Sequence, residues 1–110
     1  MIGICFLAAQ PQRWGFCNAG PEKMAPKVLL IAPAPVAQGD CPFGHLFDEG
    51  ALKSAGFKAA YAEVAADRGI PFLNAGDYAH CPVPDTIHID EEGCARLGVA
   101  VAAKVLEILG

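Results

Sequence analysis

Asp85 and His88 are separated by two residues, and both side-chain types can take part in proton transfer. A carboxylate three residues before a histidine, on a tight loop, can accept a hydrogen bond from the imidazole Nδ1–H. That bond fixes the tautomer whose Nε2 is free to act as a general base, and it stabilises the imidazolium formed during reaction. Asp85 and His88 are therefore the candidate catalytic pair. From this short pattern alone, the favoured interpretation is a loop histidine that only bonds Asp85 and helps to cap a helix.

Strands and helices are expected on both sides of this pair. The segment 27–32, which is apolar throughout after Lys27 and is closed by Pro33, is typical of a strand buried on both faces of a parallel sheet. A helix is expected from about 46 to 68, followed by Gly69 as a left-handed C′ residue. A second strand at 71–75 completes a right-handed crossover unit. One stripe of the helix is expected to face the core: Phe57, Ala60, Tyr61, Val64 and Ala65.

A last helix is expected to begin after Asp90, which can cap it, and to run to about Leu109. Asp85 and His88 then lie between the second strand and this helix, at the sheet edge where open α/β sheets bind ligands. The helix is apolar around more than half of its circumference, so we expect it to be covered. Its two apolar stripes are Leu97, Val101, Val105 and Ile108, and Ala95, Val99, Ala102, Leu106 and Leu109.

In this order of elements, the segment around Asp85 and His88 resembles the last conserved block of the SGNH hydrolases, the GDSL-type esterases. That block is D-x-x-H, an apolar residue, an acidic turn and a helix containing L-G, and residues 85–98 of this chain read DTIHIDEEGCARLG. The resemblance continues through 27–33, 53–61 and 70–76 and covers about residues 24–110. Family members commonly have Gly where this chain has Thr86, and a second His where it has Cys94.

The resemblance implies an α/β fold, a partial flavodoxin-like three-layer sandwich with parallel strands and crossover helices. It also implies carboxylic ester hydrolysis, in which a serine attacks the carbonyl, His88 accepts and then donates the proton, and Asp85 orients His88. The family's G-D-S block and its oxyanion-hole Gly and Asn blocks have no counterpart, since Asn18 is not flanked as in the family's G-x-N-D. We expect residues 24–110 to be the C-terminal part of such a domain, and 1–23 an irregular arm without an assigned role.

A small ester substrate is therefore expected only if a serine-bearing segment completes the site. The single serine, Ser54, is expected on the surface of the first helix. Cys81 or Cys41, served by His88, is the alternative nucleophile, although a buried or incidental cysteine is the simpler interpretation. No metal or other cofactor is expected, because no glycine-rich turn cradles a phosphate and no zinc-type spacing occurs. A zinc site is therefore not expected from the available side chains of Cys41, His45, His80, Cys81 and His88.

The charge and cysteine content indicate which binding partners and which cellular compartment to expect. Eight Lys+Arg residues against 12 Asp+Glu residues give a net charge of −4 without a basic cluster, so nucleic acid is not an expected partner. Five irregularly spaced cysteines favour reduced thiols inside a cell. The apolar N-terminal segment is not preceded by the Lys or Arg that is typical of a secretory signal peptide. No apolar run approaches the ~20 residues that are needed to span a bilayer. A cytoplasmic protein without membrane contact is expected.

The other class of function is a non-catalytic interaction module or remnant that docks on another chain through an exposed sheet edge and an apolar helix face. A domain of this size buries only about 60–65% of the surface that its unfolded chain exposes. We therefore expect the chain alone to self-associate or to fold poorly.

Overall fold

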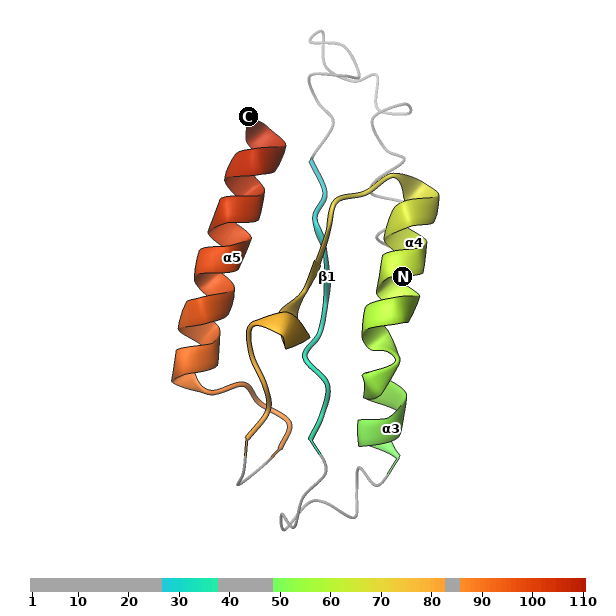
Figure 1. Ribbon diagram of the computed structural model, residues 1–110, viewed down its shortest axis with the longest axis vertical. Coiled ribbons are helices and arrows are strands. Elements are labelled where there is room, and N and C mark those ends of the chain that lie inside the picture. Colours follow the sequence, from blue (N-terminus) through green and yellow to red (C-terminus); the bar gives the residue numbers. More distant parts are fainter. Residues whose placement is uncertain (1–26, 38–48, 83–85) are drawn as a thin grey trace, which may run out of the picture.

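A computed structural model of the chain describes residues 27–37, 49–82 and 86–110. Helices α4 and α5 lie on opposite sides of a pair of strands, which gives three layers (Figure 1). The predicted α/β fold class is therefore confirmed, whereas the arm predicted at 1–23 lies outside the described residues. The elements in chain order are β1 (Leu30–Ala32), α3 (Gly50–Ala55), α4 (Phe57–Arg68), β2 (Phe72–Asn74), the 3-10 helix η3 (Ala75–Asp77) and α5 (Glu91–Leu109).

The two strands pair in parallel, as the sequence predicts. Leu30 lies opposite Phe72, and Ala32 lies opposite Asn74. Leu30 and Ala32 are buried, in agreement with the apolar run that predicts this strand. The carboxyl ends of both strands point to the same edge, where the loops that follow them meet.

The core of the described residues lies between α4 and the strands. Leu30, Ala65 and Ile70 are its buried centre. Of the stripe predicted to face the core, Ala60 alone is exposed. Gly69 ends α4 at φ 63° and ψ 34°, the left-handed conformation predicted for it. Partly buried side chains complete this core: Val28, Tyr61, Val64 and Phe72.

The single helix predicted over 46–68 is wrong, because Gly56 divides it into α3 and α4. The backbone N–H of Gly56 donates to the carbonyl of Lys53 at 3.2 Å, which tightens the last turn of α3. Glycine has one of the lowest helix propensities, so a helix is readily interrupted there. Residues 46–48 of the predicted helix lie outside the described residues.

Helix α5 begins and ends where the sequence predicts. The Asp90 carboxylate accepts a hydrogen bond from the N–H of Gly93 at 2.6 Å, as expected of an N-cap. Gly93 is required at this position, since a Cβ atom would lie 2.8 Å from Asp90 Oδ1 and 3.0 Å from the Cβ of Ala79. The helix is therefore anchored closely at its first turn.

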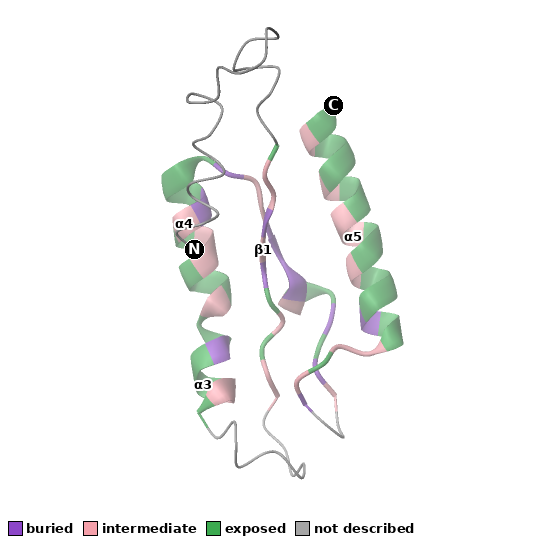
Figure 2. Cartoon of the chain, turned by 180° about the vertical axis from the view of Figure 1, so that it is seen from behind, coloured by how far each residue is buried: buried purple, intermediate pink, exposed green. Residues whose placement is uncertain are grey.

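The predicted cover of α5 is not found among the described residues. Val99 and Leu106 are 73% and 72% exposed, and Leu109 is 66% exposed. Grooves of about 690 Å³ and 460 Å³ separate parts of α5 from the strands. Figure 2 shows the helix exposed or half-buried along nearly its whole length. The pattern that predicts burial is present, but the described strands are too few to cover both stripes.

Candidate active site

His88 lies where the sequence predicts, in the loop between η3 and α5. It is exposed, and it precedes the capping residue Asp90 by two positions. An imidazole in this place is accessible to a substrate from solvent. Its predicted partner, Asp85, lies outside the described residues. The structure therefore places one member of the candidate pair.

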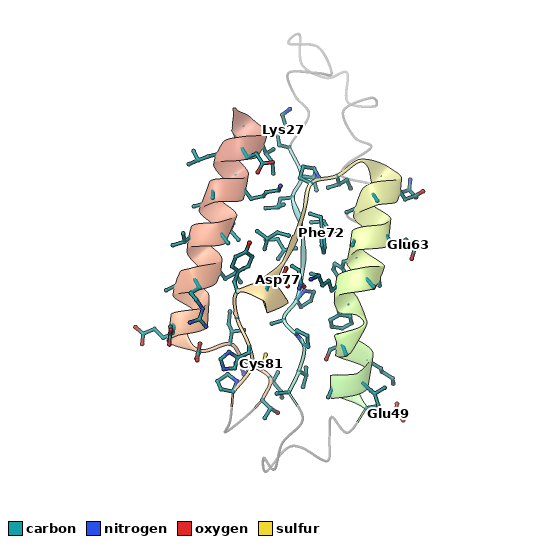
Figure 3. All side chains as sticks on the ribbon, viewed as in Figure 1. Lys27, Glu49, Glu63, Phe72, Asp77 and Cys81 are labelled. Carbon is teal, nitrogen blue, oxygen red and sulfur yellow. The ribbon has the colours of Figure 1, made fainter. Side chains whose placement is uncertain are left out.

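The loop before His88 is closed by a buried thiol. Cys81 is 2% exposed, and its Sγ donates a hydrogen bond to the backbone carbonyl of Ile87 at 3.1 Å. Figure 3 shows Cys81 near the lower end of the molecule, between the strands and the start of α5. A buried thiol that already donates to a carbonyl is poorly suited to attack a substrate. The alternative cysteine, Cys41, lies outside the described residues.

Thr86 has an unusual backbone conformation within this loop. Its φ of 63° lies in the left-handed region, which is unfavourable for a β-branched residue. Its N–H donates to the carbonyl of Pro82 at 3.0 Å, and its own carbonyl accepts from the N–H of Ala37 at 2.9 Å. Glycine adopts this conformation without cost, so the Gly that is common at this position in the family would fit the loop with less strain than Thr86.

Ser54 is buried, so its predicted place on the helix surface is wrong. The side chain is 2% exposed. Its Oγ accepts a hydrogen bond from the N–H of Val36 at 2.9 Å and donates to the carbonyl of Ala51 at 3.2 Å. This hydroxyl joins α3 to the loop after β1. The sequence could not indicate this burial, because it depends on a contact across 18 residues.

A second polar cluster lies where β2 ends. The Asn74 side-chain amide donates to Asp77 Oδ1 at 3.0 Å, and Lys58 Nζ lies 3.1 Å from the same oxygen. The hydrogen bond from Asn74, followed by that from Lys58, lowers the pKa of Asp77 below its usual value. Figure 3 shows Asp77 between α4 and α5, beside the strands. These contacts tie α4 to η3 and involve no residue of the candidate pair.

Within the described ranges, no three His, Cys, Asp or Glu residues come together as a metal site. The 690 Å³ groove between β2 and α5 has Tyr78, Arg96 and Lys104 among its lining residues, but not His88. Arg96 Nε donates to the carbonyl of Tyr78 at 2.8 Å, so it holds α5 to the preceding loop. No helix in the described part of the chain is sufficiently long and apolar to cross a membrane.

Solved structures of other proteins are similar to this chain in both sequence and fold. The chain is similar to the aryl esterase of M. smegmatis, with 34% identity and a TM-score of 0.71 over 76% of this chain and 40% of the esterase. A protein named as an arylesterase, from Agrobacterium tumefaciens str. C58, is 32% identical with a TM-score of 0.70, over 80% of this chain and 42% of that one. A third solved structure is 31% identical with a TM-score of 0.76, over 99% of this chain and 49% of the other.

These aryl esterases are SGNH hydrolases with a flavodoxin-like fold. The resemblance to that family is thus confirmed in structure as well as in sequence. The chain spans less than half the length of each of these solved structures. No protein-family model matches the chain, and a search of curated proteins found no similar one.

The sequence did not indicate the parts played by Cys81 and Thr86. The sequence predicts a buried or incidental Cys81 more readily than a nucleophile or a zinc ligand, but it does not indicate the hydrogen bond by which this thiol holds the loop before His88. For Thr86 a signal was present, because a position that is commonly Gly in a family often requires a positive φ.

Proposed function

We propose that residues 24–110 form the C-terminal part of an SGNH-type ester hydrolase site, with His88 as general base and Asp85 as the carboxylate that orients it. The main support is the similarity to aryl esterases at 32–34% identity, in a chain whose exposed His88 lies in the loop before α5. An aryl or short-chain carboxylic ester is the proposed substrate. His88 accepts the proton of the attacking serine and then donates it to the leaving group.

The serine is proposed to come from a segment outside these 110 residues. Ser54 is the single serine, and its buried hydroxyl is bonded to Val36 and Ala51. Cys81 is buried as well and donates to a backbone carbonyl. Neither side chain presents a nucleophile to a substrate. Because the family's oxyanion-hole Gly and Asn blocks also have no counterpart in the chain, the proposed serine-bearing segment must supply the oxyanion hole as well.

A complementation assay tests this proposal. The full chain is mixed with the part of the M. smegmatis aryl esterase that has no counterpart in it, and hydrolysis of p-nitrophenyl acetate is followed. We expect turnover in the mixture that exceeds the sum of the two parts. His88→Ala should lower it by at least about 100-fold, because general-base catalysis contributes about 10²–10⁴-fold.

His80→Ala is the matched control, since His80 is exposed and lies near the same loop. It should retain the turnover of the unchanged chain. Equal turnover by the His88→Ala variant, in a mixture shown to assemble, would contradict the role of His88. Turnover by the chain alone that His88→Ala abolishes would instead place the nucleophile within these 110 residues.

The second candidate is an interaction module that docks on another chain, and the exposed apolar face of α5 favours it. This face carries Val99, Leu106 and Leu109, each more than half exposed. Large apolar side chains gathered on one helix are more often covered by a partner than left in water. The two functions are compatible, because the serine-bearing segment is one such partner.

A further inference from the structure

The edge of β1 that faces away from β2 has no neighbouring strand within residues 27–37, 49–82 and 86–110. The N–H of Leu30 donates to the carbonyl of Pro71 at 3.0 Å, so the backbone of Leu30 faces β2. Successive residues of a strand direct their N–H and C=O groups to opposite edges, so those of Ile31 point away from β2. β1 therefore presents a donor and an acceptor on this outer edge.

The composition of β1 is that of an interior strand. No residue from Val28 to Ala32 carries a charge. Leu30 packs against α4, and the half-buried Ile31 lies on the opposite face of the sheet, toward α5. Parallel strands that are apolar on both faces are typically interior, whereas natural edge strands often carry charges that prevent further pairing. The sheet is therefore expected to continue beyond the outer edge of β1.

An apolar groove of about 460 Å³ lies between the residues that lead into β1 and the C-terminal end of α5. It is lined by Lys27, Val28, Leu29, Val105, Ile108 and Leu109, and no residue of β2 contributes to it. Lys27 is the one charged residue of this lining. The groove beside β2, by contrast, has four charged residues in its lining, Asp77, Arg96, Lys104 and Glu107. The β1 side is thus the better place for an apolar strand.

We propose that the outer edge of β1 is the docking site of the serine-bearing segment, which adds a strand parallel to β1 and places an apolar side chain in this groove. The inference rests on the proposed function, because that function requires the segment. The chain covers 40–49% of the solved structures similar to it, so more than half of each of them has no counterpart here. A strand parallel to β1 would bring its carboxyl end to the sheet edge near the loop of His88.

Hydrogen–deuterium exchange of single amides, followed by NMR, tests this docking site in the full 110-residue chain. The probe is the part of the M. smegmatis aryl esterase that has no counterpart in the chain. In the chain alone, the Ile31 amide should exchange faster than the Leu30 amide, which is bonded to Pro71. With the segment at saturation, exchange at Ile31 should slow by at least about tenfold, because its N–H then donates to the added strand.

The amide of Phe72 is the internal control. Phe72 lies opposite Leu30, and its N–H points to the other edge of the sheet, away from β1. The ratio of the Ile31 and Phe72 exchange rates removes any general effect of the segment on folding. This ratio should fall at least about tenfold when the segment binds.

A pair of variants tests the same edge by affinity. Ile31→Pro removes the outward N–H but no bond to β2, and proline is tolerated where the N–H of an edge strand faces outward. It should weaken binding of the segment at least about tenfold. Ile31→Val keeps the N–H and should bind almost as tightly as the unchanged chain. If Ile31→Pro does not fold by circular dichroism, the exchange ratio of the unchanged chain decides the outcome.

Turnover of p-nitrophenyl acetate is measured in the same mixtures, with His88→Ala as the comparison. Turnover that depends on His88, without a change in the exchange ratio, would overturn the docking site and leave the proposed function standing. A lower ratio without such turnover would support the docking site and contradict the proposed function. Slower exchange at Ile31 as the chain alone is concentrated would make a second copy the occupant and overturn the proposal. Absence of binding would overturn it as well.

Discussion

The Ser54 hydroxyl accepts a hydrogen bond from the N–H of Val36, which is half-buried. Ser54→Ala removes this acceptor, so the free energy of unfolding should fall by about 0.5–1.5 kcal/mol. Urea denaturation measures this difference. Lys53→Ala, at the exposed neighbouring position, should change it by less than about 0.5 kcal/mol. Equal stability of the two variants would show that the bond to Val36 contributes little.

Two substitutions at Thr86 separate the backbone conformation from the lost side chain. Thr86→Gly and Thr86→Ala both remove the buried hydroxyl and methyl groups, but only glycine accepts a φ of 63° without strain. We expect the glycine variant to be more stable than the alanine variant by about 1 kcal/mol. Thermal or urea unfolding of the pair gives the answer. A more stable alanine variant would contradict the left-handed conformation.

At the scale of elements, the Asp77 carboxylate joins α4 to the end of β2 through Lys58 and Asn74. The hydrogen bond from Asn74, then that from Lys58, lowers the pKa of Asp77 in the folded chain below 3.8. A lowered folded-state pKa means that the contribution of this group to stability is present above about pH 4 and is lost as the pH falls through the folded pKa.

Asp77→Asn should therefore be less stable than the unchanged chain near neutral pH, and the difference should vanish in acid. Urea unfolding at a series of pH values tests this. Asp67→Asn is the control, because it removes the same charge from the end of α4 without touching η3. A stability difference for Asp77→Asn that stayed constant down to pH 3 would contradict the shifted pKa.

The elements were predictable where local chemistry decides them. The cap at Asp90, the left-handed Gly69 and the apolar run of β1 are all local signals, and the structure confirms each of them. The break at Gly56 was missed because a glycine inside an apolar periodic segment is often tolerated. The 3-10 helix after β2 was missed as well, since it depends on how the chain packs around Asn74 and Asp77.

At the scale of the whole molecule, the exposed apolar face of α5 is the feature that the described residues leave uncovered. We expect the chain alone to associate at rising concentration through this face. The double variant Val99→Lys with Leu106→Lys should lower the association, measured by sedimentation. Both positions are exposed on α5, so these changes should leave the α4 core intact.

Glu63→Lys is the matched control, because it changes the net charge of −4 by the same two units. Glu63 projects from α4 away from the strands (Figure 3). It should leave the association nearly unchanged. Equal loss of association in both variants would attribute the effect to charge, and a monomer at all concentrations would contradict the interaction surface.

The candidate site was predictable in its position and less so in its support. The pattern from Asp85 to His88 predicted a loop before the last helix, and the structure places His88 there. Two of the hydrogen bonds that hold this loop come from residues outside the motif. Cys81 precedes the motif by a few residues, and Ala37 is far from it in sequence. A sequence motif identifies the candidate side chains. Their orientation depends on tertiary packing, which cannot be predicted from a single sequence.

Chemical rescue tests the central claim, that His88 is the general base of ester hydrolysis, most directly. His88→Gly and His80→Gly chains are each mixed with the complementing esterase segment, and phenyl acetate hydrolysis is followed with and without imidazole. We predict that His88→Gly is inactive and that imidazole restores its turnover at least about tenfold above the reaction of imidazole with the ester alone. His80→Gly should be active without imidazole and unaffected by it. Full activity of His88→Gly in the assembled mixture, without imidazole, would contradict the account.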